Sequence, residues 1–263
     1  MHHPTLRIAC VQMFLAWQDE QKNLHTMKQY LTQAASQGIE LIVFPETVTT
    51  GFTVSPSELA SLTSSQPTDQ IAQWSRQYNI AIATTLLVRE GEKIFNRFFF
   101  FSPQGDIYTQ DKRHLFRMGG EHKALASASC RITIEYLGWN IFPAICYDLR
   151  FPVWCRNRNL EYDLMLVPAN WPQPRAQVWQ TLLRARAIEN LSYVCGVNRV
   201  GEDPHKIVYQ GDTQIISFRG EVIASAQTHT AELITAELSQ EKLRQFREKF
   251  ATWRDADSFS IDF

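Results

Sequence analysis

Long apolar runs are missing from this sequence of 263 residues. A membrane-spanning helix needs about 20 consecutive apolar residues, and no stretch approaches that length. The first residues carry two histidines and a proline, and they lack the basic and apolar segments of a secretory signal peptide. We therefore expect a protein with neither a membrane span nor a cleaved leader.

Strong charge of either sign is also missing, since the formal net charge at pH 7 is −1. No overall field would draw the protein to nucleic acid or to an anionic membrane, so we expect neither as a partner. A pocket that selects a charged ligand would have to do so with a few local residues.

Cysteine is scarce and scattered. The five cysteines are an odd number, lie far apart and include no Cys-x-x-Cys pair, which argues against a disulfide framework or a zinc cluster. This usage fits a reducing compartment, and we expect a cytoplasmic protein. Glycine and proline are few, while 44% of the residues are hydrophobic and 20% are charged, a composition typical of an ordered globular protein.

Short apolar strands alternate with amphipathic helices along the chain, which predicts an α/β fold. The run Leu41-Ile42-Val43-Phe44 is apolar without interruption, as expected for a strand buried on both faces of a sheet. In the first half we predict strands at 6–12, 41–44, 80–88, 93–101 and 107–110, and helices at 21–35 and 69–78.

A second cycle with a similar order of elements begins near residue 131. Here we predict strands at 131–136, 139–146, 164–167, 193–197, 213–217, 222–226 and 231–236, and helices at 152–159, 176–190 and 240–249. The longest irregular stretch, 47–67, fits a loop that covers a site better than a domain boundary. Because no linker or low-complexity segment interrupts the chain, we predict one domain over residues 1–263 with two sheets, each covered by helices.

The first segment that carries chemistry is the end of the strand at 41–44. Pro45 cannot continue a central ladder, so the strand stops and Glu46 follows at its carboxyl end. Functional sites of α/β sheets are built at this edge. Taken alone, Glu46 would fit an ordinary solvated strand end better than a functional site.

The second segment is DKRHLF at 111–116, in which Lys112, Arg113 and His114 are consecutive basic residues. Such a run usually forms a solvated face. It follows directly on a predicted strand and precedes Leu115 and Phe116, so at least one of the three side chains could point inward, although the segment taken alone fits a solvated face better.

The third segment is IFPAICYDLR at 141–150. Cys146 ends an apolar run and is followed by polar residues and a predicted helix. Most cysteines in apolar strands are inert core residues, and Cys10 and Cys195 fit that description. A thiol at a strand-to-helix turn differs, because backbone N–H groups there favour a thiolate and a developing oxyanion.

Together these segments provide the groups for amide hydrolysis. Cys146 would attack the amide carbon, and Glu46 would accept the thiol proton and pass it to the leaving amine. Lys112 would stabilise negative charge on the carbonyl oxygen. Glu121 is the nearest downstream carboxylate that could keep Lys112 charged. This chemistry requires no metal and no organic cofactor.

The ordered set of motifs resembles the nitrilase superfamily. The motifs are Pro-Glu at 45–46, DKRHLF at 111–116, ICYDLRFP at 145–152, PANWP at 168–172, WQTLLRARAIEN at 179–190 and GDT at 211–213. The resemblance implies a four-layer αββα sandwich and a Glu-Lys-Cys triad at Glu46, Lys112 and Cys146. It also implies a supporting glutamate at Glu121.

Within the superfamily, the chain is most similar to bacterial omega-amidases, which implies hydrolysis of the terminal amide of 2-oxoglutaramate or 2-oxosuccinamate through a cysteine thioester. Such substrates end in a carboxylate and need a cationic partner in the pocket. The candidate arginines are Arg113, Arg150 and Arg175. The aromatic candidates for the walls of a small pocket are Phe52, Phe116, Tyr147 and Trp171, which would also fit an ordinary core.

Three alternatives remain open from the sequence. The same triad would serve another amidase of the superfamily, such as a deaminated glutathione amidase, a carbamoyl amide hydrolase or a nitrilase. A non-catalytic binding or scaffold protein is a second alternative, against which the intact triad argues. A protease-like pair of Cys146 and His114 is a third, and it leaves Glu46 and Lys112 without roles. The resemblance further implies a homodimer, to which the tail at about 250–263 could contribute.

Overall fold

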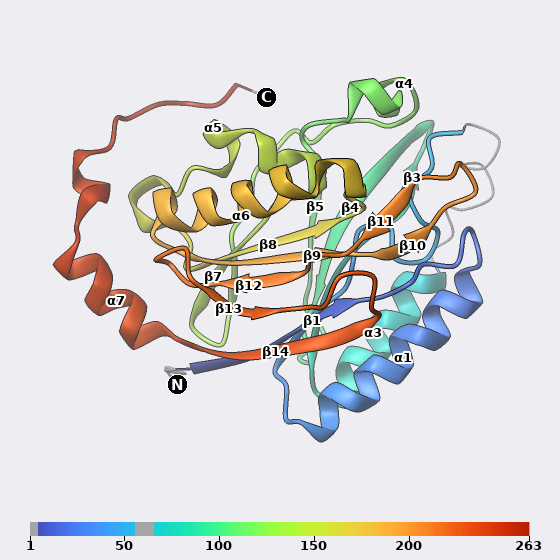
Figure 1. Ribbon diagram of the computed structural model, residues 1–263, viewed down its shortest axis with the longest axis horizontal. Helices are drawn as coiled ribbons and strands as arrows, with labels where there is room; N and C mark the ends of the chain where they lie inside the picture. Colours follow the sequence, from blue (N-terminus) through green and yellow to red (C-terminus); the bar gives the residue numbers. More distant parts are fainter. Residues whose placement is uncertain (1–4, 56–65, 263) are drawn as a thin grey trace.

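Two six-stranded sheets lie face to face in the computed structural model, which describes residues 5–55 and 66–262 (Figure 1). The first sheet has the order β14 (Glu232–Ser239), β1 (Thr5–Gln12), β2 (Leu41–Val43), β3 (Ala81–Glu90), β4 (Lys93–Phe101) and β5 (Ile107–Asp111). The second has the order β13 (Val222–Ser225), β12 (Gln214–Ile216), β9 (Tyr193–Asn198), β8 (Leu164–Ala169), β7 (Trp139–Pro143) and β6 (Ile134–Tyr136).

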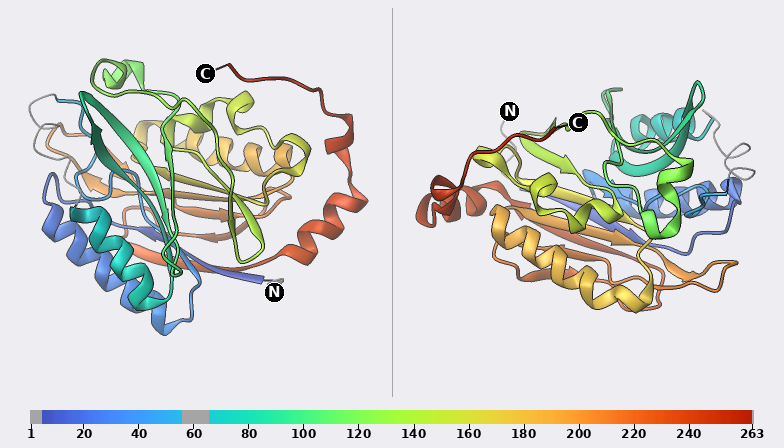
Figure 2. Two further views of the ribbon diagram at one scale, coloured as in Figure 1. Left: turned by 180° about the vertical axis from the view of Figure 1, so that it is seen from behind. Right: turned by 90° about the horizontal axis from the view of Figure 1, so that it is seen from above.

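Parallel strands form the centre of each sheet and antiparallel strands form its edges. β2 pairs in parallel with β1 and β3, and β8 pairs in parallel with β7 and β9. Parallel sheets need apolar cover on both faces. Helices α1 (Glu20–Ser36) and α3 (Gln66–Tyr78) cover the first sheet, whereas α5 (Pro152–Cys155) and α6 (Ala176–Asn190) cover the second (Figure 2). The predicted αββα sandwich is confirmed.

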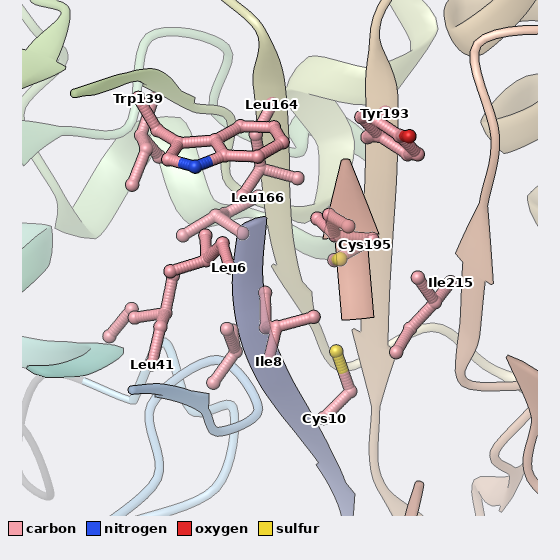
Figure 3. Packing of buried hydrophobic residues seen from close by; sticks show 14 of the residues in the cluster. Leu6, Ile8, Cys10, Leu41, Trp139, Leu164, Leu166, Tyr193, Cys195 and Ile215 are labelled. Atoms are coloured by element: carbon pink, nitrogen blue, oxygen red, sulfur yellow. The ribbon is translucent and has the colours of Figure 1, made fainter. Parts of the chain in front are cut away.

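Alternating side chains build three packed layers. Because successive strand residues point to opposite faces, Leu6, Ile8 and Cys10 of β1 pack between the sheets, while Ala9 and Val11 pack under α1 and α3. Figure 3 shows the layer between the sheets, where residues of β1 and β2 meet Trp139, Leu164, Leu166, Tyr193, Cys195 and Ile215 of the second sheet.

The helices begin and end where the local sequence provides caps. Asp19 accepts a hydrogen bond from the Lys22 backbone N–H at the start of α1, at 3.0 Å. Ser239 does the same for Lys242 at the start of α7 (Gln240–Lys249), at 3.2 Å. Such caps satisfy N–H groups that have no partner within the helix. Within the described residues, no helix is both long and apolar enough to cross a membrane.

Several predicted boundaries are wrong. The strand predicted at 139–146 ends at Pro143, which lacks the N–H group that a ladder needs. The helix predicted at 152–159 ends at Cys155. A short 3-10 helix follows at Arg158–Leu160, where Asn159 and Leu160 have positive φ angles that an α-helix does not tolerate. Of the strand predicted at 131–136, only the last three residues are strand.

Among the described α-helices and strands, the helix α4 (Glu121–Ala124) and the hairpin of β10 (Val200–Glu202) and β11 (Val208–Gln210) were not predicted. Residues 56–65 of the loop predicted at 47–67 lie outside the described residues. Residues 47–55 are turn and irregular structure, and residues 66–67 belong to the start of α3. After α7, the tail passes through the 3-10 helix Thr252–Asp255 and returns towards α5 (Figure 1).

Candidate active site

The predicted catalytic side chains come together at one edge of the two sheets. Glu46 follows β2, Lys112 follows β5, and Cys146 follows β7. β5 is antiparallel to β4, which is antiparallel to β3, so β5 ends at the same edge as β2 and β3. The first sheet thus supplies the carboxylate and the ammonium, and the second sheet supplies the thiol.

The Glu46 carboxylate is completely buried and held from both sides. One oxygen accepts hydrogen bonds from Lys112 Nζ at 2.9 Å and from Asn96 Nδ2 at 2.8 Å. The other accepts the backbone N–H of Asn170 at 2.8 Å, and the Asn170 side chain donates to the Glu46 carbonyl at 2.8 Å. These bonds connect the two sheets and fix the orientation of the carboxylate.

Lys112 lies between two buried carboxylates. Its ammonium is 2.9 Å from Glu46 and 3.0 Å from Glu121, and it lies 5.5 Å from the centre of the Phe52 ring. The second oxygen of Glu121 accepts the Phe116 backbone N–H at 2.6 Å. Lys112 can therefore donate two of its three N–H bonds to these carboxylates and direct the third elsewhere.

Burial and charge act in opposite directions on this cluster. Burial alone would lower the pKa of Lys112, but the negative charges of Glu121 and Glu46 outweigh it and raise the pKa well above the usual value. Burial raises the pKa of Glu121. The positive charge of Lys112 acts to lower it, and the negative charge of Glu46 raises it further. Lys112 is therefore a permanent cation at neutral pH.

Cys146 occupies a tight turn. Its φ angle of +45° lies in the left-handed region, which is uncommon for a residue with a side chain. It begins the 3-10 helix Cys146–Arg150, and the Asp148 carboxylate accepts the Ile145 backbone N–H at 3.0 Å. The same carboxylate accepts the backbone N–H and Nδ1 of His114, both at 2.8 Å. Asp148 thus ties the cysteine turn to the segment that carries Lys112.

The Cys146 thiol is not a ready-made thiolate. Burial and the negative charge of Glu46 raise its pKa well above the usual value, although Lys112 and a backbone hydrogen bond of Asn170 act to lower it. The expectation that the helix start would favour the thiolate is therefore wrong. The thiol needs a base, and the buried Glu46 carboxylate is the nearby group with that chemistry.

A cavity of about 350 Å³ opens above these groups. Its lining includes Lys112 and Cys146, together with all four aromatic residues predicted as walls and two of the three candidate arginines: Phe52, Phe116, Tyr147, Arg150, Trp171 and Arg175. Tyr147 packs edge to face on Phe116, with ring centres 5.1 Å apart. The aromatic walls make the cavity small and mostly apolar.

Arg113 does not line this cavity among the residues that the structure describes. Its guanidinium donates to the carbonyls of Ala128 at 2.8 Å and Asp262 at 2.7 Å. His114 is likewise absent from the described lining, and its ring stacks on Phe151 with centres 3.6 Å apart. The geometry places both residues outside the pocket and beside the loops that support it.

The cavity lining includes residues that the sequence did not predict, among them Asn170 and four others. Asn170 follows β8 at the same edge as Cys146, so the reasoning that located Glu46 could have found it. The others lie in and around the β10–β11 hairpin, where the Asp-Pro pair at 203–204 was an available turn signal. They are Asp203, His205, Ile207 and Tyr209. Within residues 5–55 and 66–262, no group of three or more His, Cys, Asp or Glu side chains could hold a metal ion.

Comparisons with known proteins agree with this geometry. The carbon-nitrogen hydrolase family model matches residues 7–248, a range that includes every residue placed in the site. Omega-amidase YafV of Escherichia coli (strain K12) is 44% identical over 262 residues, which cover 98% of this chain and 99% of the relative. The 2-oxoglutaramate amidase of Bacillus subtilis (strain 168) is 27% identical, covering 94% of this chain and 96% of the relative. XC1258 from Xanthomonas campestris, a CN-hydrolase superfamily protein with an arsenic adduct in its active site, superposes with a TM-score of 0.93 and 38% identity, covering 99% of this chain and 100% of that chain.

Proposed function

Because the chain belongs to the carbon-nitrogen hydrolase family and is a hydrolase of amides, we propose that it is an omega-amidase. Its substrates would be short 2-oxo dicarboxylic acid monoamides, namely 2-oxoglutaramate and 2-oxosuccinamate. The products would be the 2-oxo acid and ammonia. The proposal depends most on one observation, the Lys112 ammonium held between two buried carboxylates in the cavity that Cys146 also lines.

The proposed reaction begins with proton transfer. Glu46 takes the proton of the Cys146 thiol as the sulfur attacks the amide carbon, because the raised pKa of this thiol leaves it protonated at rest. The carbonyl oxygen becomes negatively charged in the tetrahedral intermediate. Lys112, with an N–H bond to spare, donates to that oxygen. Glu121 keeps Lys112 charged and oriented.

The intermediate then collapses. The carbon–nitrogen bond breaks, Glu46 returns its proton to the leaving nitrogen, and ammonia departs from a thioester on Cys146. Water next attacks the thioester with Glu46 as the base. The acid is released and the thiol is restored with its proton. The small cavity with aromatic walls suits a short substrate, and the similarity to omega-amidase YafV supports this substrate class over larger amides.

The test is ammonia release from 2-oxoglutaramate and 2-oxosuccinamate, measured beside deaminated glutathione and a simple nitrile. Turnover of the first two is expected, with none in Cys146→Ala, because a methyl group cannot form a thioester. Cys130→Ala is the matched control, since Cys130 is exposed and should keep full activity. Preference for another member of the panel would keep the chemistry and overturn the substrate. No turnover of any substrate in the panel would favour a binding role.

Lys112→Met tests the oxyanion role separately. We expect kcat to fall by roughly 10²–10³-fold, the cost of losing one donor to a developing oxyanion. The variant also leaves Glu46 and Glu121 buried without their cation, so its melting temperature should be recorded beside the kinetics. A rise in KM with unchanged kcat would show that Lys112 binds the substrate without stabilising the oxyanion.

A further inference from the structure

Among the described residues, three cationic side chains line the cavity, and one of these three is paired with carboxylates that the structure describes. Lys112 is paired with Glu46 and Glu121. Arg150 and Arg175 also line the cavity, and neither guanidinium has a hydrogen bond or an ion pair with any residue among 5–55 and 66–262. Two uncompensated positive charges in a small apolar cavity will attract an anionic group.

Both arginines make cation–π contacts with aromatic residues of the cavity. The guanidinium carbon of Arg150 lies 5.0 Å from the centre of the Trp171 ring, and that of Arg175 lies 5.5 Å from the centre of the Phe116 ring. A cation–π contact restrains a guanidinium without using up its N–H donors. The indole N–H of Trp171 also donates to the Arg175 carbonyl at 2.8 Å, which links the two arginine–aromatic pairs.

Asp203, the carboxylate among the described lining residues, already accepts three hydrogen bonds from its own loop. One of its oxygens accepts the backbone N–H groups of His205 at 2.8 Å and Ile207 at 3.0 Å. The other accepts the Tyr209 hydroxyl at 3.1 Å. Asp203 therefore fixes the hairpin loop and does not neutralise either arginine. A ligand with an ammonium group would find no free carboxylate among these residues.

We propose that Arg150 and Arg175 form a two-arginine clamp that binds the 2-oxo carboxylate end of the substrate. This inference rests on the proposed function and identifies the residues that select its substrate class. A 2-oxo acid presents a planar set of carboxylate and ketone oxygens, all acceptors, which two guanidinium forks can share. The matching 2-amino acid, glutamine, places an ammonium among cations, so the clamp rejects it by charge.

The position of the clamp matches the chemistry. Arg150 ends the 3-10 helix that Cys146 begins. Arg175 ends the short helix Gln173–Arg175, which follows Asn170 after β8. The segment that begins with Cys146 therefore also carries Arg150, and the segment that follows Asn170 carries Arg175. A short substrate can reach from one to the other within the same cavity.

The experiment compares Arg150→Gln and Arg175→Gln on two five-carbon amides, 2-oxoglutaramate and the neutral pentanamide. We expect each variant to lose about 10–100-fold in kcat/KM for 2-oxoglutaramate, mainly through KM, as for a lost charge-assisted hydrogen bond. Pentanamide turnover should change less than about threefold, since it makes no such bond. The wild type should discriminate against L-glutamine, and both variants should lose part of that discrimination.

Controls separate the clamp from the fold and from the proposed function. Arg76→Gln on α3, an exposed arginine, should behave as the wild type. Arg150→Lys and Arg175→Lys keep the positive charge, and they should lose less than the Gln variants. Equal losses on both amides, or an effect of only one arginine, would overturn the clamp. If the wild type ignores 2-oxoglutaramate but hydrolyses glutaramate (the monoamide of glutaric acid) with the same arginine dependence, the clamp stands as a carboxylate site and the omega-amidase proposal fails. Fast 2-oxoglutaramate turnover that does not depend on either arginine would support the omega-amidase proposal and overturn the clamp.

Discussion

The thiol of Cys146 lies beside groups of both signs, and their balance decides how it can react. Burial and Glu46 raise its pKa, while Lys112 lowers it, and the net effect is a raised pKa. Lys112 is largely neutralised by its own two carboxylates, so it stabilises a thiolate less than a free cation would. Proton transfer to Glu46 is therefore part of each proposed turnover, and no stored thiolate precedes it.

This balance predicts how Cys146 responds to pH. Because a raised pKa keeps the thiol protonated at neutral pH, its alkylation by iodoacetamide should continue to accelerate as the pH rises through 9, the ordinary value for a cysteine. Peptide mapping by mass spectrometry at timed intervals would give the rate for each cysteine. Alkylation of the exposed Cys130 in the same sample shows that the reagent is active. A rate for Cys146 that levels off below pH 8 would mean a preformed thiolate.

At the scale of elements, Asp148 connects the two loops that supply the proposed nucleophile and cation. Its buried carboxylate accepts three hydrogen bonds, one from Ile145 and two from His114. Ile145 precedes Cys146, and His114 lies two residues after Lys112. Movement of either loop would stretch these bonds, so Asp148 is a positioning residue for both.

Asp148→Asn should therefore impair catalysis without touching the substrate. The amide nitrogen would face a donor N–H, and an unsatisfied buried group of this kind costs about 1–3 kcal/mol. We expect a melting temperature lower by several degrees and a fall in kcat with little change in KM. Asp255→Asn, at an exposed position, is the matched control. A normal kcat in a destabilised variant would reduce Asp148 to a purely structural role.

Local signals in the sequence predict most elements correctly, and their failures have physical causes. Leu6 to Val11 alternate between two packed layers, so β1 was predictable from periodicity. The hairpin β10–β11 has strands of only three residues, too short for a period-two pattern to show. The helix ends early at Cys155 because Arg156 has an extended backbone, with φ −62° and ψ 129°, and the sequence has neither glycine nor proline there to signal it.

Some residues of the candidate site were predictable from the sequence, and others required the structure. Glu46, Lys112 and Cys146 each follow a strand, and strand ends can be read from sequence. Choosing among three arginines required the structure, because the turn of Arg113 towards Ala128 and Asp262 depends on distant backbone carbonyls. Burial of Cys146 was also invisible in its local sequence, which is why the thiolate expectation failed. A single domain over 1–263 and a cytoplasmic location stay predictions.

At the scale of the whole molecule, the site depends on the contact between the two sheets. Glu46 and Lys112 belong to one sheet, and Cys146 and Asn170 belong to the other. The layer between the sheets, with Leu6, Leu164 and Leu166 fully buried, keeps them in register (Figure 3). Each such buried side chain contributes roughly 1.5–3 kcal/mol. Core packing therefore sets the distance between the proposed base and its thiol.

The C-terminal tail packs against the second sheet's helices and the segment that carries Arg113. Ile261 packs against the cluster under α5 and α6, and the Asp262 carbonyl accepts a hydrogen bond from Arg113 at 2.7 Å. Arg113 directly follows Lys112, so the tail braces the loop that carries the proposed oxyanion donor. The homodimer that the family resemblance implies, with the tail at its interface, stays a prediction beside these contacts.

Deletion of residues 251–263 should therefore lower stability and kcat. The loss of the Ile261 contact and of one hydrogen bond to Arg113 predicts a drop of a few degrees in melting temperature, since about 1 kcal/mol shifts a protein of this size by roughly 2–4 °C. Arg113→Gln should reproduce part of the fall in kcat without shortening the chain. Size-exclusion chromatography with light scattering would report the mass of each variant. A full-length dimer that becomes a monomer on truncation would place the tail at the subunit interface. An unchanged kcat in both variants would show that the loop carrying Lys112 holds its position without the tail.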